Sequence, residues 1–212
     1  MYENYVKRGL DFLLSVLAII VLAIPMLLIA VSIKIDDPGP IMFTQKRIGK
    51  NKSFFQLHKY RTMKMSTPHD TPTHLLNHPE RYITRTGKWL RKFSADELLQ
   101  LFDITRGYMS FVGPRPALWN QEDLLAERDK YGANDVRPGL TGWAQINGRD
   151  ELEIAEKARL DGEYVAELKS GGIHAFLFDC KCFFGTFIKV LHSDGVVEGG
   201  TGDLAKRGRE NG

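Results

Sequence analysis

The chain has 212 residues, enough for one catalytic-sized domain with a modest extra element and too few for two full domains. Its 29 Lys and Arg against 26 Asp and Glu leave a formal net charge of +3, which excludes a protein that binds nucleic acid through bulk charge. The 43% hydrophobic content excludes disorder as the main state, and the mean hydropathy of −0.25 is that of a soluble protein apart from one segment.

That segment is residues 10–33, whose only charged side chain is Asp11, and residues 16–30 carry no polar side chain at all. At about 1.5 Å per residue, an unbroken helix of this length would cross a hydrocarbon core of about 30 Å. Pro25 removes the amide that would bond to the Val21 carbonyl, so a kink or break is predicted near Ile24. Neither arm could then cross the membrane alone.

Basic residues on both sides of the segment bear on its topology. Cations that tend to stay on the cytoplasmic side both precede and follow it, namely Lys7 and Arg8 before it and Lys34, Lys46, Arg47, Lys50 and Lys52 after it. A re-entrant helix satisfies both ends, whereas the alternative is an ordinary signal anchor with a proline kink. A cleaved signal peptide is not indicated, because no small-x-small site follows the apolar stretch.

Two short strands are predicted next, over residues 41–47 and 54–61, joined as a hairpin by the turn Gly49-Lys50-Asn51-Lys52. Residues 66–73 are polar and contain two prolines, which is typical of a surface loop. The spacing of His69, His74 and His78 lacks the Glu of a metalloprotease motif, so we interpret them as solvated side chains.

Helical periodicity follows over residues 87–101, 119–130 and 152–168. The connections between these segments, GYMSFVGPRP and VRPGLTGWAQINGR, are rich in Gly, Pro and Arg, as in loops that approach a ligand closely. Residues 174–191 combine phenylalanines with lysines and fit either a helix in the membrane interface or a buried core helix. Cys180 and Cys182 are one residue apart, which fits neither a disulfide framework nor a zinc site and favours a reducing compartment.

Paired carboxylates follow a basic stretch in RYITRTGKWLRKFSADE, where cations and aromatics suited to an anionic membrane surface precede Asp96 and Glu97. The same residues form a capping box, with Ser94 at the N-cap and Glu97 reaching back to it, so a purely structural role is the alternative to catalysis. A diphosphate substrate would need cations for its oxygens and carboxylates for a hard metal ion. Four such cations lie at predicted strand ends or in predicted loops, namely Lys59, Arg61, Arg115 and Arg137.

Several motifs in one order, PGPIMFTQKRIG, HKYRTM, LRKFSADELLQL, GYMSFVGPRP, RPGLTGWAQINGR and LDGEYV, resemble the bacterial sugar transferase family, the monotopic phosphoglycosyl transferases. The resemblance covers nearly the whole chain and is to short members that consist of the catalytic unit alone. It implies a re-entrant helix broken at Pro25, and transfer of a phosphosugar from a UDP-sugar to polyprenyl (undecaprenyl) phosphate with release of UMP.

The resemblance also implies roles for individual residues. Asp96 would be the nucleophile that forms an aspartyl-phosphosugar, and Glu97, with Asp96, would hold Mg²⁺. The substrate groups would be bound by the cations named above and by further residues: Arg91 near a lipid or acceptor phosphate, Arg115 and Arg137 at the donor diphosphate, and Gln145 and Asn147 at the uridine or sugar end.

Two positions depart from the family pattern: Ile24 precedes Pro25 where many members carry Ser, and Leu99 stands where many carry Pro after the carboxylate pair. The first departure leaves the angle of the membrane break open. The second removes no catalytic group.

The predicted protein is therefore of α+β class and mostly helical, with a re-entrant membrane helix, amphipathic interfacial helices and a small β-hairpin. Its predicted parts are a membrane helix at 1–36, a catalytic domain at 37–195 and a Gly-rich tail at 196–212. We expect it at the cytoplasmic face of a bacterial inner membrane, in contact with phospholipids and not with nucleic acid. The alternatives are a non-catalytic, single-span interaction module and a conventional glycosyltransferase that releases UDP.

Overall fold

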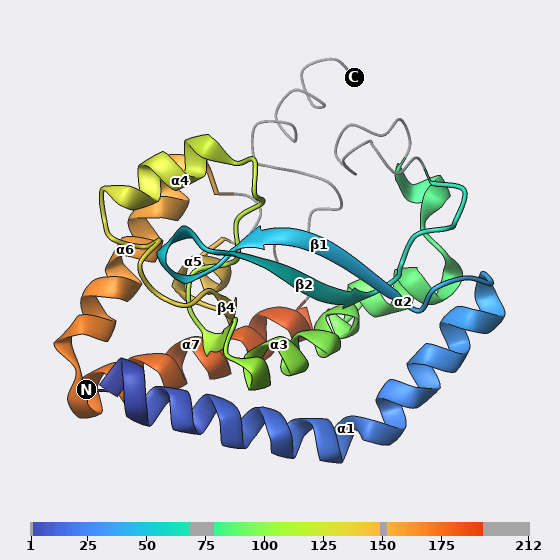
Figure 1. Ribbon diagram of the computed structural model, residues 1–212, viewed down its shortest axis with the longest axis horizontal. Coiled ribbons are helices and arrows are strands. Elements are labelled where there is room, and N and C mark those ends of the chain that lie inside the picture. Colours follow the sequence, from blue (N-terminus) through green and yellow to red (C-terminus); the bar gives the residue numbers. More distant parts are fainter. Residues whose placement is uncertain (1, 68–78, 149–151, 193–212) are drawn as a thin grey trace.

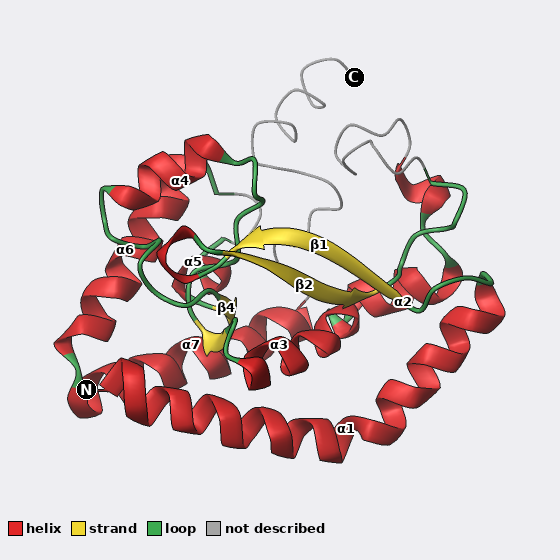
Figure 2. Ribbon diagram, in the orientation of Figure 1, coloured by secondary structure: helices red, strands yellow, loops and turns green. Residues whose placement is uncertain are grey.

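The computed structural model describes residues 2–67, 79–148 and 152–192 of the chain. It is mostly helical with two small sheets, as the α+β prediction requires (Figures 1 and 2). The predicted tail at 196–212, the three histidines at 69, 74 and 78, and most of the predicted loop at 66–73 lie outside the described residues.

Helix α1 (Arg8–Asp36) lies along one side of the molecule, and α3 (Gln100–Arg106) separates it from the antiparallel hairpin of β1 (Met42–Ile48) and β2 (Phe54–Tyr60) (Figure 1). The hairpin confirms the predicted strands, and its register pairs Met42 with Tyr60 and Ile48 with Phe54. Its turn contains the short helix η2 (Lys50–Lys52), in which Asn51 adopts a left-handed conformation at φ 53°.

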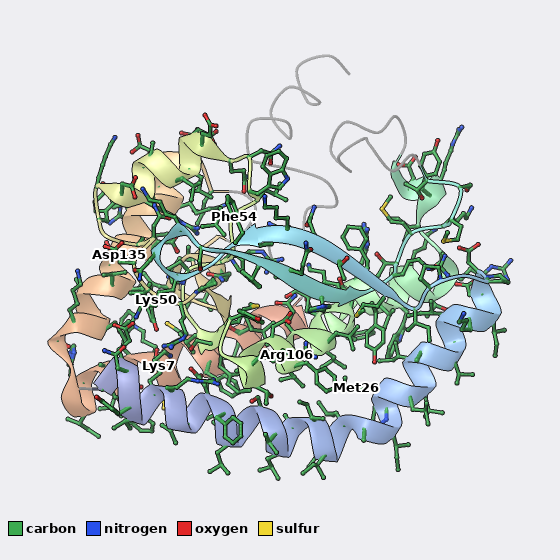
Figure 3. The ribbon with its side chains drawn as sticks, in the orientation of Figure 1. Lys7, Met26, Lys50, Phe54, Arg106 and Asp135 are labelled. Carbon is green, nitrogen blue, oxygen red and sulfur yellow. The ribbon has the colours of Figure 1, made fainter. Side chains whose placement is uncertain are left out.

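Helix α1 continues through Pro25 without interruption and bends beside Met26, so the proline kinks the helix rather than dividing it (Figures 1 and 3). Proline removes one backbone hydrogen bond and crowds the preceding turn, which bends a helix at that point. The hydroxyl of Tyr60 donates to the carbonyl of Met26 over 2.9 Å. A side chain of the hairpin is therefore attached to α1 at the bend.

The polar side chains in the first half of α1 face the rest of the protein. Arg8 donates to the carbonyls of Ile104 and Thr105 at the C-terminal end of α3, each over 2.7 Å. Asp11 and Ser15 are buried: Asp11 Oδ1 accepts from the amide of Phe111 over 3.1 Å, and Ser15 Oγ lies 2.9 Å from the hydroxyl of Thr105.

The opposite face of α1 exposes large apolar side chains, including Ile20, Val21, Ile24, Leu27 and Leu28. Together with the short helix η1 (Tyr2–Lys7) that precedes it, α1 is long and apolar enough to cross a membrane, with a mean hydropathy of 3.1 in its most apolar window and 11% of that window buried. An apolar surface of this extent marks a site of contact with lipid or another protein.

A buried polar cluster ties the start of the chain to its last helices. Asp179, in α7 (Gly172–His192), accepts from Lys7 Nζ at 2.8 Å and from the hydroxyls of Tyr2 at 2.6 Å and Tyr164 at 2.9 Å. Tyr164 belongs to α6 (Ile154–Ser170), the helix predicted at 152–168. Buried charges require such partners, so this cluster fixes the N-terminal arm of α1 against α6 and α7.

Helix α7, predicted at 174–191 as either an interfacial or a core helix, has one apolar face in the core and another that is exposed. Ala175 and Cys182 are buried in the core, whereas Ile173, Leu177, Phe184 and Ile188 are exposed. This exposed row favours the interfacial interpretation. Both cysteines are free, as expected, and burial raises the pKa of the Cys182 thiol to about 12.

The helix predicted at 87–101 is divided. Helix α2 (Arg85–Lys92) ends before Ser94, which is left-handed at φ 52°, and the short helix η5 (Ala95–Leu99) then leads into α3. The predicted capping box is wrong, because Ser94 makes no side-chain capping bond and the carboxylate of Glu97 turns instead to two cations. A charged partner competes better for a carboxylate than a neutral amide does.

The Gly-rich connections contain a short parallel pair of strands that the sequence pattern did not indicate, β3 (Ser110–Val112) and β4 (Gly139–Thr141). Gly113 lies so close to the second strand that a Cβ on it would stand 2.5 Å from the carbonyl oxygen of Arg137. The remaining short helices are η4 (Pro79–Tyr82), which precedes α2, α4 (Glu122–Asp129) and α5 (Trp143–Ile146), of which α4 confirms the helix predicted at 119–130.

Leu90 joins α2 to α1 and provides a test of this packing. Its side chain is wholly buried against Met26, Ile29 and Ile33. We expect Leu90→Ala to lower the free energy of unfolding by about 2–5 kcal/mol, because it leaves a cavity between the two helices. Denaturant unfolding in detergent micelles measures the loss, and Ile173→Ala, at an exposed position, should change stability by less than about 0.5 kcal/mol.

Candidate active site

Glu97 is the centre of a buried ion-pair cluster. Its Oε1 accepts from Lys59 Nζ at 2.7 Å and from Arg115 Nη2 at 2.8 Å, and only 6% of the residue is exposed. Burial alone would raise the pKa of Glu97, but the two cations outweigh it and hold the pKa well below its ordinary value. Glu97 is therefore ionised at neutral pH.

Asp96 precedes Glu97 in the first turn of η5 and is half-buried. Burial raises the pKa of Asp96 above its ordinary value; Lys59 opposes this rise, the neighbouring Glu97 carboxylate adds to it, and Arg91 opposes it. Two adjacent carboxylates thus have pKa values pushed in opposite directions, a feature common at catalytic sites and less common in purely structural ion pairs.

The hairpin positions Lys59 for this cluster. Next to it in β2, His58 is bound to the fully buried Asp103 of α3: the His58 amide donates to Oδ2 at 3.0 Å, and Nδ1 lies 2.6 Å from Oδ1. The short helix η5, which carries Asp96 and Glu97, leads directly into α3. The double contact between His58 and Asp103 therefore holds the strand that carries Lys59 close to the two carboxylates.

Arg115 is positioned by a chain of buried groups from a distant part of the sequence. The carboxylate of Asp161 accepts from Arg128 Nε at 2.8 Å, and Arg128 Nη2 donates to the backbone carbonyl of Arg115 at 3.0 Å. Asp161 and Arg128 are 1% and 3% exposed. The LDGEYV motif, which contains Asp161, thereby holds the GPRP loop in place beside Glu97.

Arg47 is a member of the site that the sequence analysis did not single out. It lies at the end of β1, donates from Nη1 to the carbonyl of Pro116 at 2.9 Å, and interacts electrostatically with Arg115 and Glu97. Burial, and then the repulsion of Arg115, lower its pKa to about 10, with Glu97 acting in the opposite direction. Arg47 is part of the KRIG motif, but the sequence around an arginine at a strand end does not indicate whether the arginine is buried.

Three predicted binding residues make their hydrogen bonds elsewhere, and a fourth, Gln145, makes none with its side chain among the described residues. Arg61 binds the side chain and backbone carbonyl of Asp37 at the end of α1, and Arg137 Nε donates to the carbonyl of Gly107 at 3.1 Å. Asn147 is exposed and donates to the carbonyl of Trp143. The side-chain amide of Gln145 is buried without a hydrogen-bond partner among the described residues, so its predicted role remains a prediction.

Arg91 lies on α2 beside the pair of carboxylates. Its Nε donates to Thr62 Oγ1 at 2.9 Å, and its charge lowers the pKa of Asp96. With Lys59, Arg115 and Arg47, it surrounds the two carboxylates with more positive than negative charge. Such a site attracts polyanions such as a diphosphate.

The number and type of the two carboxylate groups also match the ligands by which proteins usually bind magnesium. Mg²⁺ is usually held by one or two carboxylates together with substrate phosphates and water, not by a cage of protein ligands. Within the described residues there is no group of three or more His, Cys, Asp or Glu side chains that could form such a cage. Asp96 and Glu97 would be the protein's contribution.

The chain belongs to the bacterial sugar transferase family, whose profile matches residues 2–193. The matched residues include α1, the hairpin, the cluster around Glu97 and α7. Membrane association follows from the apolar α1 and from the relatives described next.

Three relatives illustrate the family. The chain is 40% identical over 169 residues to the undecaprenyl-phosphate glucose phosphotransferase of Komagataeibacter xylinus, covering 75% of this chain and 32% of the relative. It is 35% identical over 194 residues to the UDP-glucose:undecaprenyl-phosphate glucose-1-phosphate transferase of Escherichia coli, covering 88% and 40%. It is 35% identical over 192 residues to the uncharacterized sugar transferase EpsL of Bacillus subtilis, covering 91% and 90%.

The chain thus spans about a third of the Komagataeibacter protein and nearly all of the Bacillus protein. The two relatives named for their reactions are transferases of phosphorus-containing groups.

The raised pKa of Asp96 makes a prediction for stability. A raised pKa in the folded state means that the contribution of Asp96 is favourable below its unfolded pKa of about 3.9 and is lost as the pH rises through the folded pKa. We expect Asp96→Asn to increase the free energy of unfolding at neutral pH by on the order of 1 kcal/mol, with the gain vanishing at about pH 4 and below. Denaturant unfolding in micelles at the two pH values measures the difference.

Glu97→Gln is the matched control for this experiment, because the lowered pKa of Glu97 has the opposite sign. Its stabilisation is present above the unfolded pKa and lost as the pH falls through the folded one, so the variant should be less stable than the wild type at neutral pH. A loss of stability at neutral pH in both variants would contradict the assignment of Asp96 as the strained member of the pair.

Proposed function

We propose that this protein is a phosphoglycosyl transferase that moves a phosphosugar from a UDP-sugar to polyprenyl phosphate and releases UMP, the first step in assembling a surface glycan. The observation that carries the proposal is the Asp96–Glu97 pair, ringed by Lys59, Arg91 and Arg115. The names of the relatives support the donor and acceptor classes.

In the proposed first step, a carboxylate oxygen of Asp96 forms a bond to the β-phosphorus of the UDP-sugar. The bond from that phosphorus to the bridging oxygen breaks, and UMP leaves with the electron pair. In the second step, a phosphate oxygen of the polyprenyl phosphate attacks the same phosphorus and Asp96 is released as a carboxylate. Splitting one displacement into two in this way is the general role of a covalent intermediate.

The surroundings of Asp96 suit this role. Its raised pKa marks a carboxylate that is less stabilised than one in water, whereas Lys59 and Arg91 keep enough positive charge beside it to receive phosphate oxygens. Glu97, held by Lys59 and Arg115, keeps those two cations fixed in place. Arg47, which is half-buried and interacts electrostatically with Arg115 and Glu97, adds further positive charge for the diphosphate.

We assign a Mg²⁺ ion to the same carboxylates, as a cofactor that neutralises charge on the donor diphosphate when bound. Glu97 would supply its ionised carboxylate for this purpose, and Asp96 would supply the second oxygen donor. Removal of divalent cations by a chelator is therefore part of the activity assay described below.

The membrane helix would bring the two substrates together. A re-entrant α1, with both ends on the cytoplasmic side, would leave the cluster around Glu97 facing the compartment where nucleotide sugars are made, while the acceptor lipid reaches it from the leaflet. The bend beside Met26 and the contact of Arg8 with the end of α3 support this arrangement. The exposed apolar row of α7 would lie in the interface.

Nucleotide release tests the reaction. Purified protein in detergent, with Mg²⁺, polyprenyl phosphate and a panel of UDP-sugars, should release UMP from at least one donor. We expect Asp96→Asn to lower this rate by at least about a thousandfold, because it removes the nucleophile, and chelation of Mg²⁺ to abolish it. Without acceptor, the wild type should release UMP in an amount limited to one per enzyme and gain the mass of a phosphosugar.

Asp135→Asn, which replaces an exposed aspartate, is the matched control and should retain full activity. Release of UDP would identify a conventional glycosyltransferase instead. UMP that appears only when acceptor is also present, with no labelled enzyme, would contradict the covalent step. Full activity in Asp96→Asn would remove Asp96 from the mechanism altogether.

Cysteine accessibility tests the topology. Asn4 and Ser66 are exposed on either side of α1 in sequence, so each is replaced singly by Cys in a Cys180→Ser background. A membrane-impermeant maleimide should label neither position in intact cells and both after permeabilisation. Labelling of only one position in intact cells would show a single span, and labelling of both would show that the domain faces the other side.

A further inference from the structure

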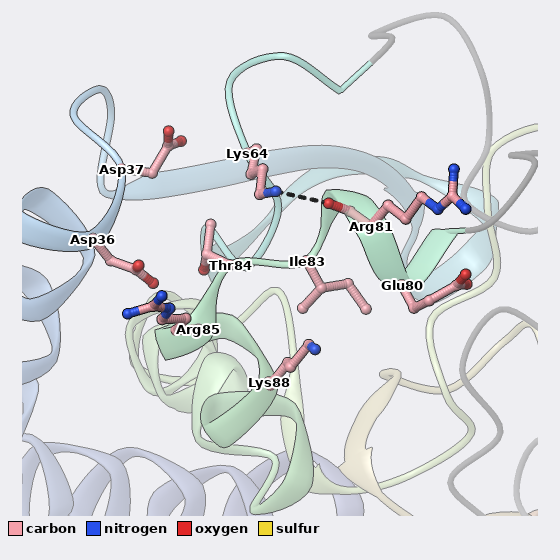
Figure 4. A pocket seen from close by; sticks show the side chains of 9 residues that line it. All are labelled: Asp36, Asp37, Lys64, Glu80, Arg81, Ile83, Thr84, Arg85 and Lys88. Atoms are coloured by element: carbon pink, nitrogen blue, oxygen red, sulfur yellow. Dashed lines mark hydrogen bonds between the residues drawn. The ribbon is translucent and has the colours of Figure 1, made fainter.

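A cavity of about 590 Å³ lies at the C-terminal end of α1, and none of the residues that form the cluster around Glu97 lines it (Figure 4). Its walls are the end of α1, the segment that follows β2, helix η4 and the first turn of α2. This volume is within the range of sites for small ligands and lipid headgroups.

Positively charged side chains outnumber negatively charged ones in the lining of this cavity, where the acids are Asp36, Asp37 and Glu80. Four cations line it, namely Lys64, Arg81, Arg85 and Lys88. Lys64 donates to the carbonyl of Arg81 at 2.8 Å, so its ammonium group has no carboxylate partner there. Arg81 and Lys88 form no ion pair with any residue in the described parts of the chain, and both are exposed.

Two of the acids in the cavity wall already have partners. The carboxylate of Asp37 accepts from Arg61 and from the amide of Met65, and the carboxylate of Asp36 accepts from the amide of Thr86 at 2.7 Å. These contacts hold the walls of the cavity together. The charge of Arg85 also acts on the carboxylate of Asp36.

The first turn of α2 adds to the positive potential. Thr84 caps the helix by accepting from the amide of Gly87 at 2.9 Å, and the helix then presents its N-terminal end to the cavity. The N-terminal end of a helix carries partial positive charge. The amides of Thr86 and Gly87 in this turn already donate to Asp36 and Thr84, so a ligand anion would be bound mainly by the side chains of Arg85 and Lys88.

Exposed apolar side chains occur beside the lining residues on three elements. Ile35, Met65 and Trp89 are 78%, 41% and 55% exposed, and each is adjacent in sequence to a residue of the cavity wall. A ligand that combines a phosphate with hydrocarbon would satisfy both sets of groups. Tryptophan is also the residue most typical of the headgroup level of a bilayer.

We propose that this cavity binds the headgroup phosphate of an anionic phospholipid, with Arg85 and Lys88 as its principal contacts. The lipid would hold the end of α1 and the start of α2 at the membrane surface. The site goes beyond the proposed transfer reaction and does not depend on it, because no group assigned to the chemistry lines the cavity.

Lipid binding to the full chain in neutral detergent tests the proposal. Affinities are measured for a phosphatidylglycerol and for a phosphatidylcholine with the same acyl chains. We expect the wild type to prefer phosphatidylglycerol and the double variant Arg85→Gln/Lys88→Gln to bind it about tenfold more weakly, since two charge-assisted contacts are lost. The control Lys52→Gln/Lys169→Gln removes the same charge from exposed positions outside the cavity and should bind as the wild type does.

Thermal unfolding without lipid checks that the variants fold, and Lys88→Gln alone, at an exposed position, provides a second and milder variant with a smaller loss in the same direction. An equal loss of binding in the control double variant would overturn the site, as would displacement of phosphatidylglycerol by inorganic phosphate or UMP. Displacement by polyprenyl phosphate at equal concentration would assign the cavity to the acceptor instead. Asp96→Asn should bind phosphatidylglycerol normally, so a failure here is distinct from a failure of the transfer reaction.

Discussion

The buried carboxylate of Glu97 is the interaction on which the arrangement of the site depends. It joins Lys59 of the hairpin to Arg115 of a distant loop, so three segments far apart in sequence meet at one oxygen atom. A buried charge is stable only when it is compensated, and removing one of the two cations would leave Glu97 with only the other to compensate its burial. This requirement explains why further buried contacts, those of His58 with Asp103 and of Arg128 with Asp161, hold the two cations in position.

The membrane helix is constrained by the same need to give each buried polar group a partner. In the first half of α1, the polar groups of Arg8, Asp11 and Ser15 are directed at the protein, where backbone and hydroxyl groups bind them. Large apolar side chains such as Ile20 and Ile24 are directed outwards. In hydrocarbon no water is present to satisfy a polar group, so these three groups need partners within the protein. At the bend of the helix, the hydroxyl of Tyr60 in the hairpin donates to the carbonyl of Met26.

Asp96 differs from its neighbour in being destabilised by its surroundings. Burial and the adjacent carboxylate raise its pKa while nearby cations limit the rise, so the folded protein keeps a carboxylate where its charge is unfavourable. Natural proteins accept such a loss of stability mainly where the group has a use beyond structure. The pairing of one stabilised and one strained carboxylate is the physical basis for giving Glu97 a holding role and Asp96 a reactive one.

Local patterns were sufficient for the membrane helix, the kink at Pro25, the hairpin and three of the later helices, because each depends on periodicity, turn residues or proline within a short window. The ordered motifs were also sufficient for the family. Tertiary structure alone decided that Glu97 is bound by Lys59 and Arg115 rather than by a capping bond, that Arg47 belongs to the site, and that Arg61 serves the end of α1. A sequence states which side chains carry charge, but burial and long-range pairing determine which of those charges meet, and both arise only when the segments pack together.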